Sequence, residues 1–312
     1  MRDRKYLTIF FSILSLVVVA SYLLVRAIDL PKAKPLPYRN ILGEASGGKY
    51  YSLYDPQGHL VLATGMPVQT GDEYYDDKNR HYVVTKLDGF RGEMQLQREI
   101  KLPSPFARFT ATRTAQAADN IHVVLYHTHT DESYAPTDKA STQPFKGSVM
   151  QVGTALADGL RDNGISVYHS FVRHDPHDVN AYNRSRKTVF QLLKQQPDAI
   201  FDIHRDSSPA GYFYAEINSV PISRVMLVVG RQNTHMATNL KFAREVLATG
   251  QKMYPGMIKG IFMAHGNYNQ DLYPTALLIE IGTDTLPREM SDRAAMLMSD
   301  VLTSTLKARS GR

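Results

Sequence analysis

Five imidazole and carboxylate side chains stand at or just beyond the ends of three short apolar runs in this 312-residue chain. The runs are residues 121–126, 199–203 and 276–279, and the side chains are His127, His129, Glu132, His204 and Glu280. In an open α/β sheet, ligands bind beyond the carboxyl ends of the strands, so these groups should converge if the runs form one sheet. Two imidazoles and a carboxylate with one open position are the usual composition of a catalytic zinc site.

The amino-acid composition restricts the metal chemistry that is available. The chain has no cysteine, which excludes a disulfide-rich scaffold, a thiolate zinc site, an iron–sulfur cluster and a cysteine nucleophile. A metal must therefore be held by imidazole and carboxylate, and zinc suits that set. Zinc lowers the pKa of a bound water to about 7, and a second carboxylate then acts as general base. Glu280 is the expected base, because its Leu and Ile neighbours should raise its pKa toward neutrality.

The residues alone leave open which histidine of the first run would bind the metal. His127 and His129 are two residues apart, so on an extended strand both side chains point to the same side. A histidine at a strand end is also commonly a hydrogen-bonded structural residue rather than a ligand. The other histidines are expected to be structural, and they are His59, His81, His122, His169, His174, His177, His235 and His265.

Strands and helices are expected to alternate from residue 119 to residue 312. The predicted strands are residues 121–126, 165–170, 199–203, 224–229, 258–263 and 276–281. The predicted helices are residues 148–162, 182–195, 237–253 and 287–307. Strands separated by helices usually pair in parallel, with helices on both faces of the sheet. We therefore expect an α/β fold with a mostly parallel sheet for residues 119–312.

A small β module is predicted over residues 47–101. It contains two predicted hairpins, whose strand pairs are residues 50–54 with 59–63 and residues 80–87 with 91–98. Pro56 and Gly58 favour a turn in the first hairpin, and the Asp88-Gly89 pair favours one in the second. The flanking residues 27–46 and 102–118 are predicted linkers, because they contain prolines and their apolar residues do not recur at the spacing of a helix or a strand.

An uncharged, mostly apolar run occupies residues 6–25, with Arg2, Arg4 and Lys5 before it and Arg26 after it. Twenty helical residues span about 30 Å, the thickness of a bilayer's hydrocarbon core. The basic residues before the run favour an inside N terminus. Residues 1–26 are therefore predicted to be a single-pass anchor in the cell membrane, with the later residues on the extracytoplasmic side. A cleaved signal peptide is the competing interpretation, but its apolar region usually has only about 7–15 residues.

The polar clusters also resemble a known family. The matching segments are residues 127–134 (HTHTDESY), 182–188 (YNRSRKT), 202–207 (DIHRDS), 228–230, 239–243 and 268–282. In order and spacing, these six motifs look like those of the stage II sporulation protein P family, and the resemblance covers about residues 119–300. The preceding anchor and β module are also similar to those of some family members.

The resemblance implies a membrane-anchored peptidoglycan hydrolase that acts during engulfment in sporulation. It would cleave the amide between N-acetylmuramic acid and L-alanine, and also peptide cross-links, with a domain similar to the zinc-dependent N-acetylmuramoyl-L-alanine amidases. The zinc ligands would be His129 or His127, Glu132 and His204, with Glu280 catalytic and Arg205 orienting the substrate carboxylate or the scissile carbonyl. The amidases separate the first His and the Glu by around ten residues, whereas here the gap is three. Glu216 is therefore a second candidate for the carboxylate ligand.

The partners implied by the resemblance are peptidoglycan and the stage II sporulation proteins D and M. The net charge is only +6, which is compatible with an acidic wall polymer, and no nucleic-acid partner is expected. Two alternatives remain from the sequence: a non-catalytic protein that binds cell wall and scaffolds a membrane complex, and a zinc peptidase that acts on protein.

Overall fold

The computed structural model describes residues 48–104, 121–178 and 180–311. The predicted membrane anchor at residues 1–26, the linker at 27–46 and most of the linker at 102–118 lie outside these ranges. Within the described ranges, no helix is both long enough and apolar enough to cross a membrane.

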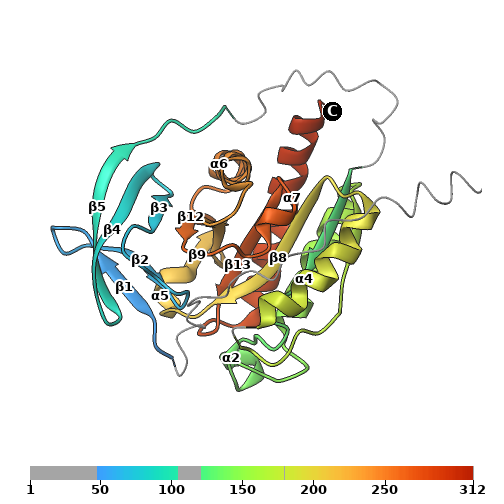
Figure 1. Ribbon diagram of the computed structural model, residues 1–312, viewed down its shortest axis with the longest axis horizontal. Helices are drawn as coiled ribbons and strands as arrows, with labels where there is room; N and C mark the ends of the chain where they lie inside the picture. The colour runs from blue at the N-terminus through green and yellow to red at the C-terminus, as the bar shows by residue number, and fades with distance from the viewer. Residues whose placement is uncertain (1–47, 105–120, 179, 312) are drawn as a thin grey trace, which may run out of the picture. The chain divides into compact units, whose positions relative to one another are not determined.

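Eleven strands form one sheet, in the order β2-β1-β5-β4-β3-β12-β11-β13-β8-β6-β7 (Figure 1). The strands of the N-terminal part are β1 (Tyr51–Tyr54), β2 (Leu60–Thr64), β3 (Glu73–Asp76), β4 (Arg80–Asp88) and β5 (Arg91–Glu99). The others are β6 (His122–Tyr126), β7 (Ser166–His169), β8 (Ala199–Asp206), β11 (Val225–Gly230), β12 (Ile258–Ala264) and β13 (Ala276–Thr283). All six strands predicted after residue 119 are therefore present.

The sheet is mixed, which corrects the expectation of a mostly parallel sheet. Strands β13, β8, β6 and β7 are parallel neighbours, but β11 pairs with β13 in the antiparallel sense. The chain between β8 and β11 explains this reversal, because it holds only a one-turn helix, α5 (Ala210–Phe213), and a hairpin of β9 (Tyr214–Ile217) and β10 (Val220–Ser223). Without a long helix to carry the chain back across the sheet, β11 starts at the edge where β8 ends.

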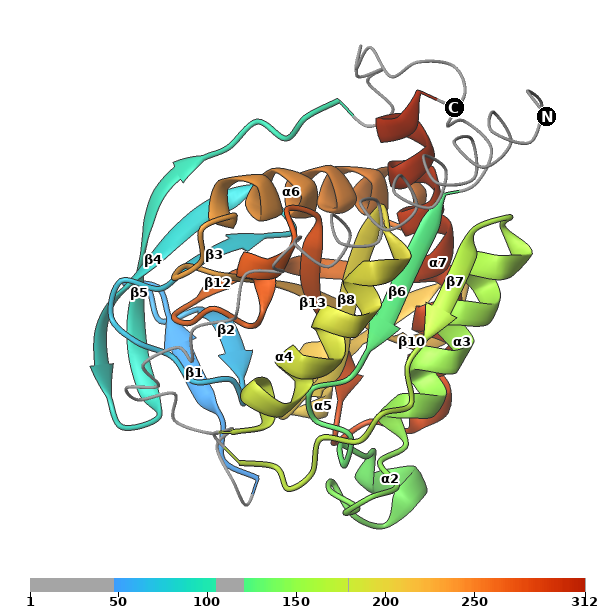
Figure 2. The same cartoon turned by 45° about the vertical axis from the view of Figure 1, so that its right-hand side comes forward.

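Helices cover both faces of the sheet, as predicted. The long helices are α3 (Val149–Asp162), α4 (Ala181–Leu192), α6 (Met236–Met253) and α7 (Arg288–Ser310). Helices α3, α6 and α7 share one apolar core with the sheet, whereas α4 packs on the other face against Val124, Tyr126 and Ile200. Figure 2 shows α4 in front of β8 and β6, with α3 and α7 behind. These layers leave the carboxyl ends of β6, β8 and β13 together at one edge of the sheet.

The strands of the predicted β module continue the same sheet. Both predicted hairpins are present as antiparallel pairs, β1 with β2 and β4 with β5. The sequence did not indicate β3, which pairs in the antiparallel sense with β12 and so joins the two parts (Figure 1). Tyr74 of β3 also donates a hydrogen bond to the Lys259 carbonyl oxygen (2.6 Å). The module is therefore bonded through its backbone to the sheet that carries the candidate site.

Candidate functional site

The three strand ends identified in the sequence converge in the structure. Strand β8 lies between β13 and β6, and all three run in the same direction. Glu280 of β13 is the register partner of His204 of β8. The loop that follows β6 turns back over this edge and carries His129 and Glu132. The predicted convergence of these groups is thus what the fold produces.

His129, Glu132 and His204 form a compact cluster. Each offers one donor atom, and the three atoms lie within 4.8 Å of one another. Oε1 of Glu132 is 3.1 Å from Nδ1 of His129 and 3.1 Å from Nδ1 of His204. The other carboxylate oxygen, Oε2, accepts a hydrogen bond from the Arg205 backbone N–H (3.0 Å). Glu132 and His204 are buried, and His129 is 9% exposed, so the cluster opens to solvent beside His129.

The electrostatics of the cluster are those of closely packed opposite charges. Burial opposes ionisation of Glu132, but His204 and Arg205 hold the pKa of its carboxyl group well below the ordinary value. Burial also opposes protonation of His204, yet the carboxylates of Asp202 and Glu132 raise its pKa well above the ordinary value. The pKa of His129 is lowered by burial and by the neighbouring imidazole of His177.

A second buried carboxylate supports His204 from within the sheet. Nε2 of His204 lies 3.0 Å from Oδ1 of Asp202, which is two residues earlier on the same face of β8. Asp202 is fixed in turn by Thr128, whose backbone N–H (2.8 Å) and hydroxyl (2.6 Å) both donate to it. Metal-binding histidines commonly direct their second nitrogen to a carboxylate in this way. The donor set and its support therefore fit a zinc ion bound by His129, Glu132 and His204.

His127 lies outside the cluster, in the interior. Its Nδ1–H donates to the Ile203 carbonyl oxygen (2.8 Å), and its Nε2 is 2.8 Å from Nε2 of His169. Burial lowers the pKa of His127 to about 4, and burial together with His127 lowers the pKa of His169 to about 3. These neutral rings form a buried pair behind the cluster, and His129 is the histidine of the first run that joins Glu132.

Arg205 is turned inward. It is 2% exposed, and its guanidinium donates to the carbonyl oxygens of Ser133 (3.2 Å) and Ser141 (2.9 Å). Its backbone N–H holds Glu132, as described above. Arg205 therefore fastens the loop that carries Glu132.

The two remaining carboxylates have contrasting positions. Glu280 is 2% exposed, and its register with His204 on a parallel neighbour places both side chains on the same face of the sheet. Glu216 is exposed on β9 and accepts a hydrogen bond from the Tyr214 hydroxyl (2.5 Å). Glu280 thus lies beside His204 on the neighbouring strand, whereas Glu216 lies in a separate two-stranded sheet.

The loop after β7 adds His177, which was expected from the sequence to be a structural histidine. The ring of His177 stacks on His129, with a centroid distance of 3.7 Å, and its Nδ1 is 3.0 Å from Oδ1 of Asp131. Tyr182, at the start of α4, contacts His129 edge-on at 5.5 Å. The sequence signal was only a pair of histidines three residues apart in a polar loop, and that spacing does not reveal a contact 48 residues away.

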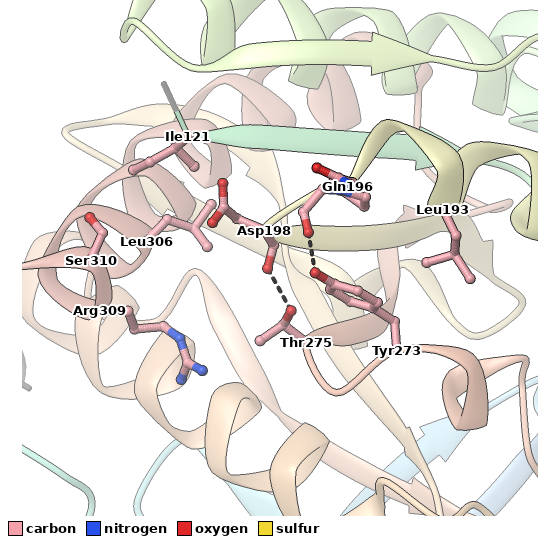
Figure 3. Close-up of a pocket in the computed structure, with 10 residues that line it drawn as sticks. Ile121, Leu193, Gln196, Asp198, Tyr273, Thr275, Leu306, Arg309 and Ser310 are labelled. Carbon is pink, nitrogen blue, oxygen red and sulfur yellow. Dashed lines mark hydrogen bonds between the residues drawn. The ribbon is translucent and has the colours of Figure 1, made fainter. Parts of the chain in front are cut away.

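A separate pocket of about 540 Å³ lies at the opposite edge of the sheet (Figure 3). Ile121, Asp198 and Thr275, which precede β6, β8 and β13, are among its lining residues. Figure 3 shows the Thr275 hydroxyl bonded to the Asp198 carbonyl oxygen (2.5 Å). No member of the His129, Glu132 and His204 cluster lines this pocket, so it is distinct from the candidate metal centre.

Three amidases are among the solved structures to which this chain shows a distant similarity. An N-acetylmuramoyl-L-alanine amidase from Clostridium difficile 630 is 18% identical, with a TM-score of 0.40 over 61% of this chain and 98% of that chain. The CwlD amidase from Clostridioides difficile, in complex with the GerS lipoprotein, is 11% identical, with a TM-score of 0.41 over 60% and 97%. The amidase AmiC2 of Nostoc punctiforme is 12% identical, with a TM-score of 0.37 over 58% and 94%.

The sequence itself has a closer relative. Stage II sporulation protein P of Bacillus subtilis (strain 168) is 31% identical over 234 residues, which cover 67% of this chain and 58% of the relative. The chain thus spans less than two thirds of that relative's length. The family model described as stage II sporulation protein P matches residues 70–303. The match includes every residue of the cluster and confirms the resemblance carried by the six motifs: the chain belongs to the stage II sporulation protein P family.

Proposed function

We propose that this chain is a zinc-dependent peptidoglycan hydrolase that cleaves the amide between N-acetylmuramic acid and L-alanine during sporulation. The observation that carries the proposal is the cluster of His129, Glu132 and His204, whose donor atoms lie within 4.8 Å of one another. Membership of the sporulation family supports the biological setting. The buried glutamate Glu280, on the neighbouring strand, supports a hydrolytic reaction rather than metal storage.

The three cluster residues would hold the zinc ion, with Asp202 orienting His204. When bound, zinc would act as a Lewis acid toward the scissile carbonyl and the attacking water. The ligand set leaves a position for substrate, because it comprises two imidazoles and one carboxylate. The side of the cluster beside His129 is the entry, since that residue is the more exposed of the two histidines.

Glu280 would move the proton. Its carboxylate accepts a proton from the attacking water as the new carbon–oxygen bond forms, and then donates that proton to the leaving amine nitrogen as the carbon–nitrogen bond breaks. The products are a carboxylic acid and an amine. Arg205 contributes by holding the loop of Glu132 through Ser133 and Ser141, which differs from the substrate-orienting role expected from the resemblance.

The proposal extends to location and partners. The family resemblance supports an anchor at residues 6–25 in the cell membrane, an extracytoplasmic hydrolase domain, and joint action with the stage II sporulation proteins D and M. It also supports a second, endopeptidase activity on peptide cross-links. The anchor, the location, the partners and the endopeptidase activity can each be disproved without disproving the amidase reaction.

The decisive experiment is to incubate the purified full chain, in detergent, with cross-linked sacculi before and after complete metal removal. We expect release of peptides with a new L-alanine amino terminus, loss of release without metal, recovery with zinc, and no release by Glu280→Gln. Release that persists without metal, or that is unchanged in Glu280→Gln, would falsify the mechanism. A protein that binds no stoichiometric zinc and releases nothing supports the scaffold, and digestion of casein instead of sacculi supports a protein peptidase.

A further inference from the structure

Two loops at the rim of the cluster expose large apolar side chains. Phe145 is 59% exposed on the loop between α2 (Ala135–Asp138) and α3, and Phe171 (57%) and Val172 (52%) are exposed on the loop after β7. Each apolar tip is followed by an exposed basic residue, Lys146 in one loop and Arg173 in the other. These five residues are called the tip surface here. Both loops lie at the lower edge of Figure 2, around α2.

A single carboxylate joins the two loops to the cluster. Oδ1 of Asp175 accepts a hydrogen bond from the Phe145 backbone N–H (3.0 Å), and Oδ2 accepts one from the Thr130 hydroxyl (2.7 Å). Thr130 follows His129 directly in the chain. Two hydrogen bonds, both accepted by Asp175, therefore link the tip carrying Phe145 to Thr130, the residue next to His129.

The other tip is connected to the site by stacked and hydrogen-bonded rings. The ring of Phe171 contacts His169, with centroids 4.3 Å apart. His169 meets His127, and His127 donates to the Ile203 carbonyl oxygen, next to His204. In addition, the same loop continues to His177, which stacks on His129. A ligand that rests on the tip surface thus lies on the loop that carries His177, which stacks on His129, and on the Phe145 loop that is bonded to it through Asp175.

The charges on these loops are unequally exposed. Their carboxylates are engaged within the protein, with Asp138 bonded to Tyr134 and Ser148, Asp175 to Phe145 and Thr130, and Asp178 to Arg184. By contrast, the charged groups of Lys146 and Arg173 make no hydrogen bond or ion pair with the residues that the structure describes. The tip surface therefore presents apolar area beside positive charge, which complements a ligand with small apolar groups and carboxylates.

We propose that the tip surface binds the acidic peptide portion of the substrate while the cluster acts on the amide at its end. This inference rests on the proposed function, and it names the group that is recognised. The small alanine side chains of the peptide contact Phe145 and Phe171, and its carboxylates pair with Lys146 and Arg173. The contact gives affinity for peptide-bearing substrates and takes no part in bond cleavage.

An anionic membrane is the other ligand that suits exposed aromatic and basic residues. The position of the tip surface favours the peptide. Lipid docking through loops that wall the cluster would turn its open side, beside His129, against the bilayer and away from a polymeric substrate. The carboxylate of Asp175 also bonds the loop after β7 to the Phe145 tip and to Thr130, the residue next to His129.

The test is calorimetric binding to the full chain carrying Glu280→Gln, with N-acetylmuramoyl-L-alanyl-D-glutamate, which has two carboxylates, and N-acetylmuramoyl-L-alaninamide, which has none, as probes. We expect the probe with the extra carboxylates to bind about tenfold more tightly, as two modest ion pairs would give. The double variant Lys146→Glu and Arg173→Glu should abolish this difference, and Phe145→Ala with Phe171→Ala should weaken binding of the longer probe. Lys86→Glu and Leu96→Ala, at exposed positions on β4 and β5, are matched controls that should change neither affinity.

Equal affinities for the two probes, or a difference that survives the charge reversal, would overturn the inference. Loss of binding to phosphatidylglycerol vesicles in the reversal variant, with probe affinities unchanged, would overturn it in favour of a lipid surface. Cleavage of sacculi by the otherwise wild-type chain is measured separately. A different outcome is that cleavage is absent while the two probes still differ in affinity and the charge-reversal variant abolishes that difference. In that case the proposed reaction fails, and the tip surface remains a peptide-binding surface.

Discussion

Glu280 and His204 are register partners on adjacent parallel strands, so the carboxylate and the imidazole leave the sheet on the same face, about 5 Å apart at the backbone. Met226 of β11 is the antiparallel partner of Glu280 on its other side. The glutamate thus stands between an apolar neighbour and a cluster histidine. Two neighbouring strands fix this position, as the proposed role of general base requires.

Shortening Glu280 tests whether its position, and not only its charge, matters. Glu280→Asp keeps the carboxylate but withdraws it by one methylene. We expect the rate of amide cleavage to fall about 100-fold, because small misplacements of a reacting group cost that much. Zinc content, measured by mass spectrometry of the metal, should stay unchanged. A rate within a few fold of the wild type would show that the proton is carried by another group.

The choice between His127 and His129 predicts a difference in metal content. His129→Asn should lower zinc stoichiometry severely, since it removes one of the three proposed ligands. His127→Asn should retain zinc, because His127 bonds to Ile203 and His169 instead. Both proteins are measured after dialysis against the same zinc buffer, with circular dichroism as the check on folding. Retention of zinc by His129→Asn together with its loss in His127→Asn would reverse the assignment.

Asp202 is expected to tune metal affinity without binding the metal. Replacing it with asparagine removes the charge facing Nε2 of His204 while leaving an oxygen near Thr128. Zinc affinity should fall roughly 10- to 100-fold, the usual effect of losing such a supporting carboxylate. Competition with a chromogenic chelator measures it. Asp198→Asn, at the other end of β8, is the control, and an equal loss in both variants would indicate a general effect on the strand.

Local sequence patterns were sufficient to locate the elements of the larger part of the chain. The stripe of Val149, Val152, Leu156 and Leu160 forms the fully buried face of α3, and each predicted strand and long helix after residue 119 is present. Because strand ends were known, the residues beyond them were known too. That is why the sequence grouped five side chains at these strand ends, namely His127, His129, Glu132, His204 and Glu280.

Strand direction and loop contacts could not be obtained in this way. The reversal of chain direction between β8 and β11 depends on the hairpin of β9 and β10. These two strands are too short for an alternation of apolar and polar residues to reveal them. The pairing of β3 with β12 joins residues that are far apart in sequence. Likewise, His177 reaches His129 from a loop that Asp175 and Arg184 hold by long-range hydrogen bonds. Such long-range contacts are set by packing rather than by local propensity.

The buried pair of His127 and His169 predicts a pH dependence of stability. Burial lowers the pKa of His169 from 6.5 to about 3, so below pH 6.5 the unfolded chain binds a proton that the folded chain excludes. Stability should therefore fall as the pH falls from 6.5 toward 4. His169→Gln cannot take up this proton, and its stability relative to the wild type should improve by about 1.4 kcal/mol per pH unit in that window. Urea unfolding of the metal-free proteins measures it, and a pH-independent difference would contradict the prediction.

Hydrogen bonds join the segment at the end of β2 to the end of β8. Oδ1 of Asp206 accepts hydrogen bonds from the Gly65 backbone N–H (2.7 Å) and the Thr64 hydroxyl (3.0 Å). A Cβ added to Gly65 would lie 2.6 Å from the Ser207 Cβ and 2.8 Å from its carbonyl oxygen, so Gly65→Ala must push the two segments apart.

We expect Gly65→Ala to lower the free energy of unfolding by about 1–3 kcal/mol, the usual cost of overpacking. It should also lower zinc affinity, since the displaced segment begins two residues after His204. Gly211→Ala is the control, because a Cβ there meets nothing within 4 Å and should change stability by less than about 0.5 kcal/mol. Urea unfolding and zinc competition are measured on both proteins. If Gly65→Ala unfolds like Gly211→Ala, the contact with Asp206 does not hold the β module to the strand that carries His204.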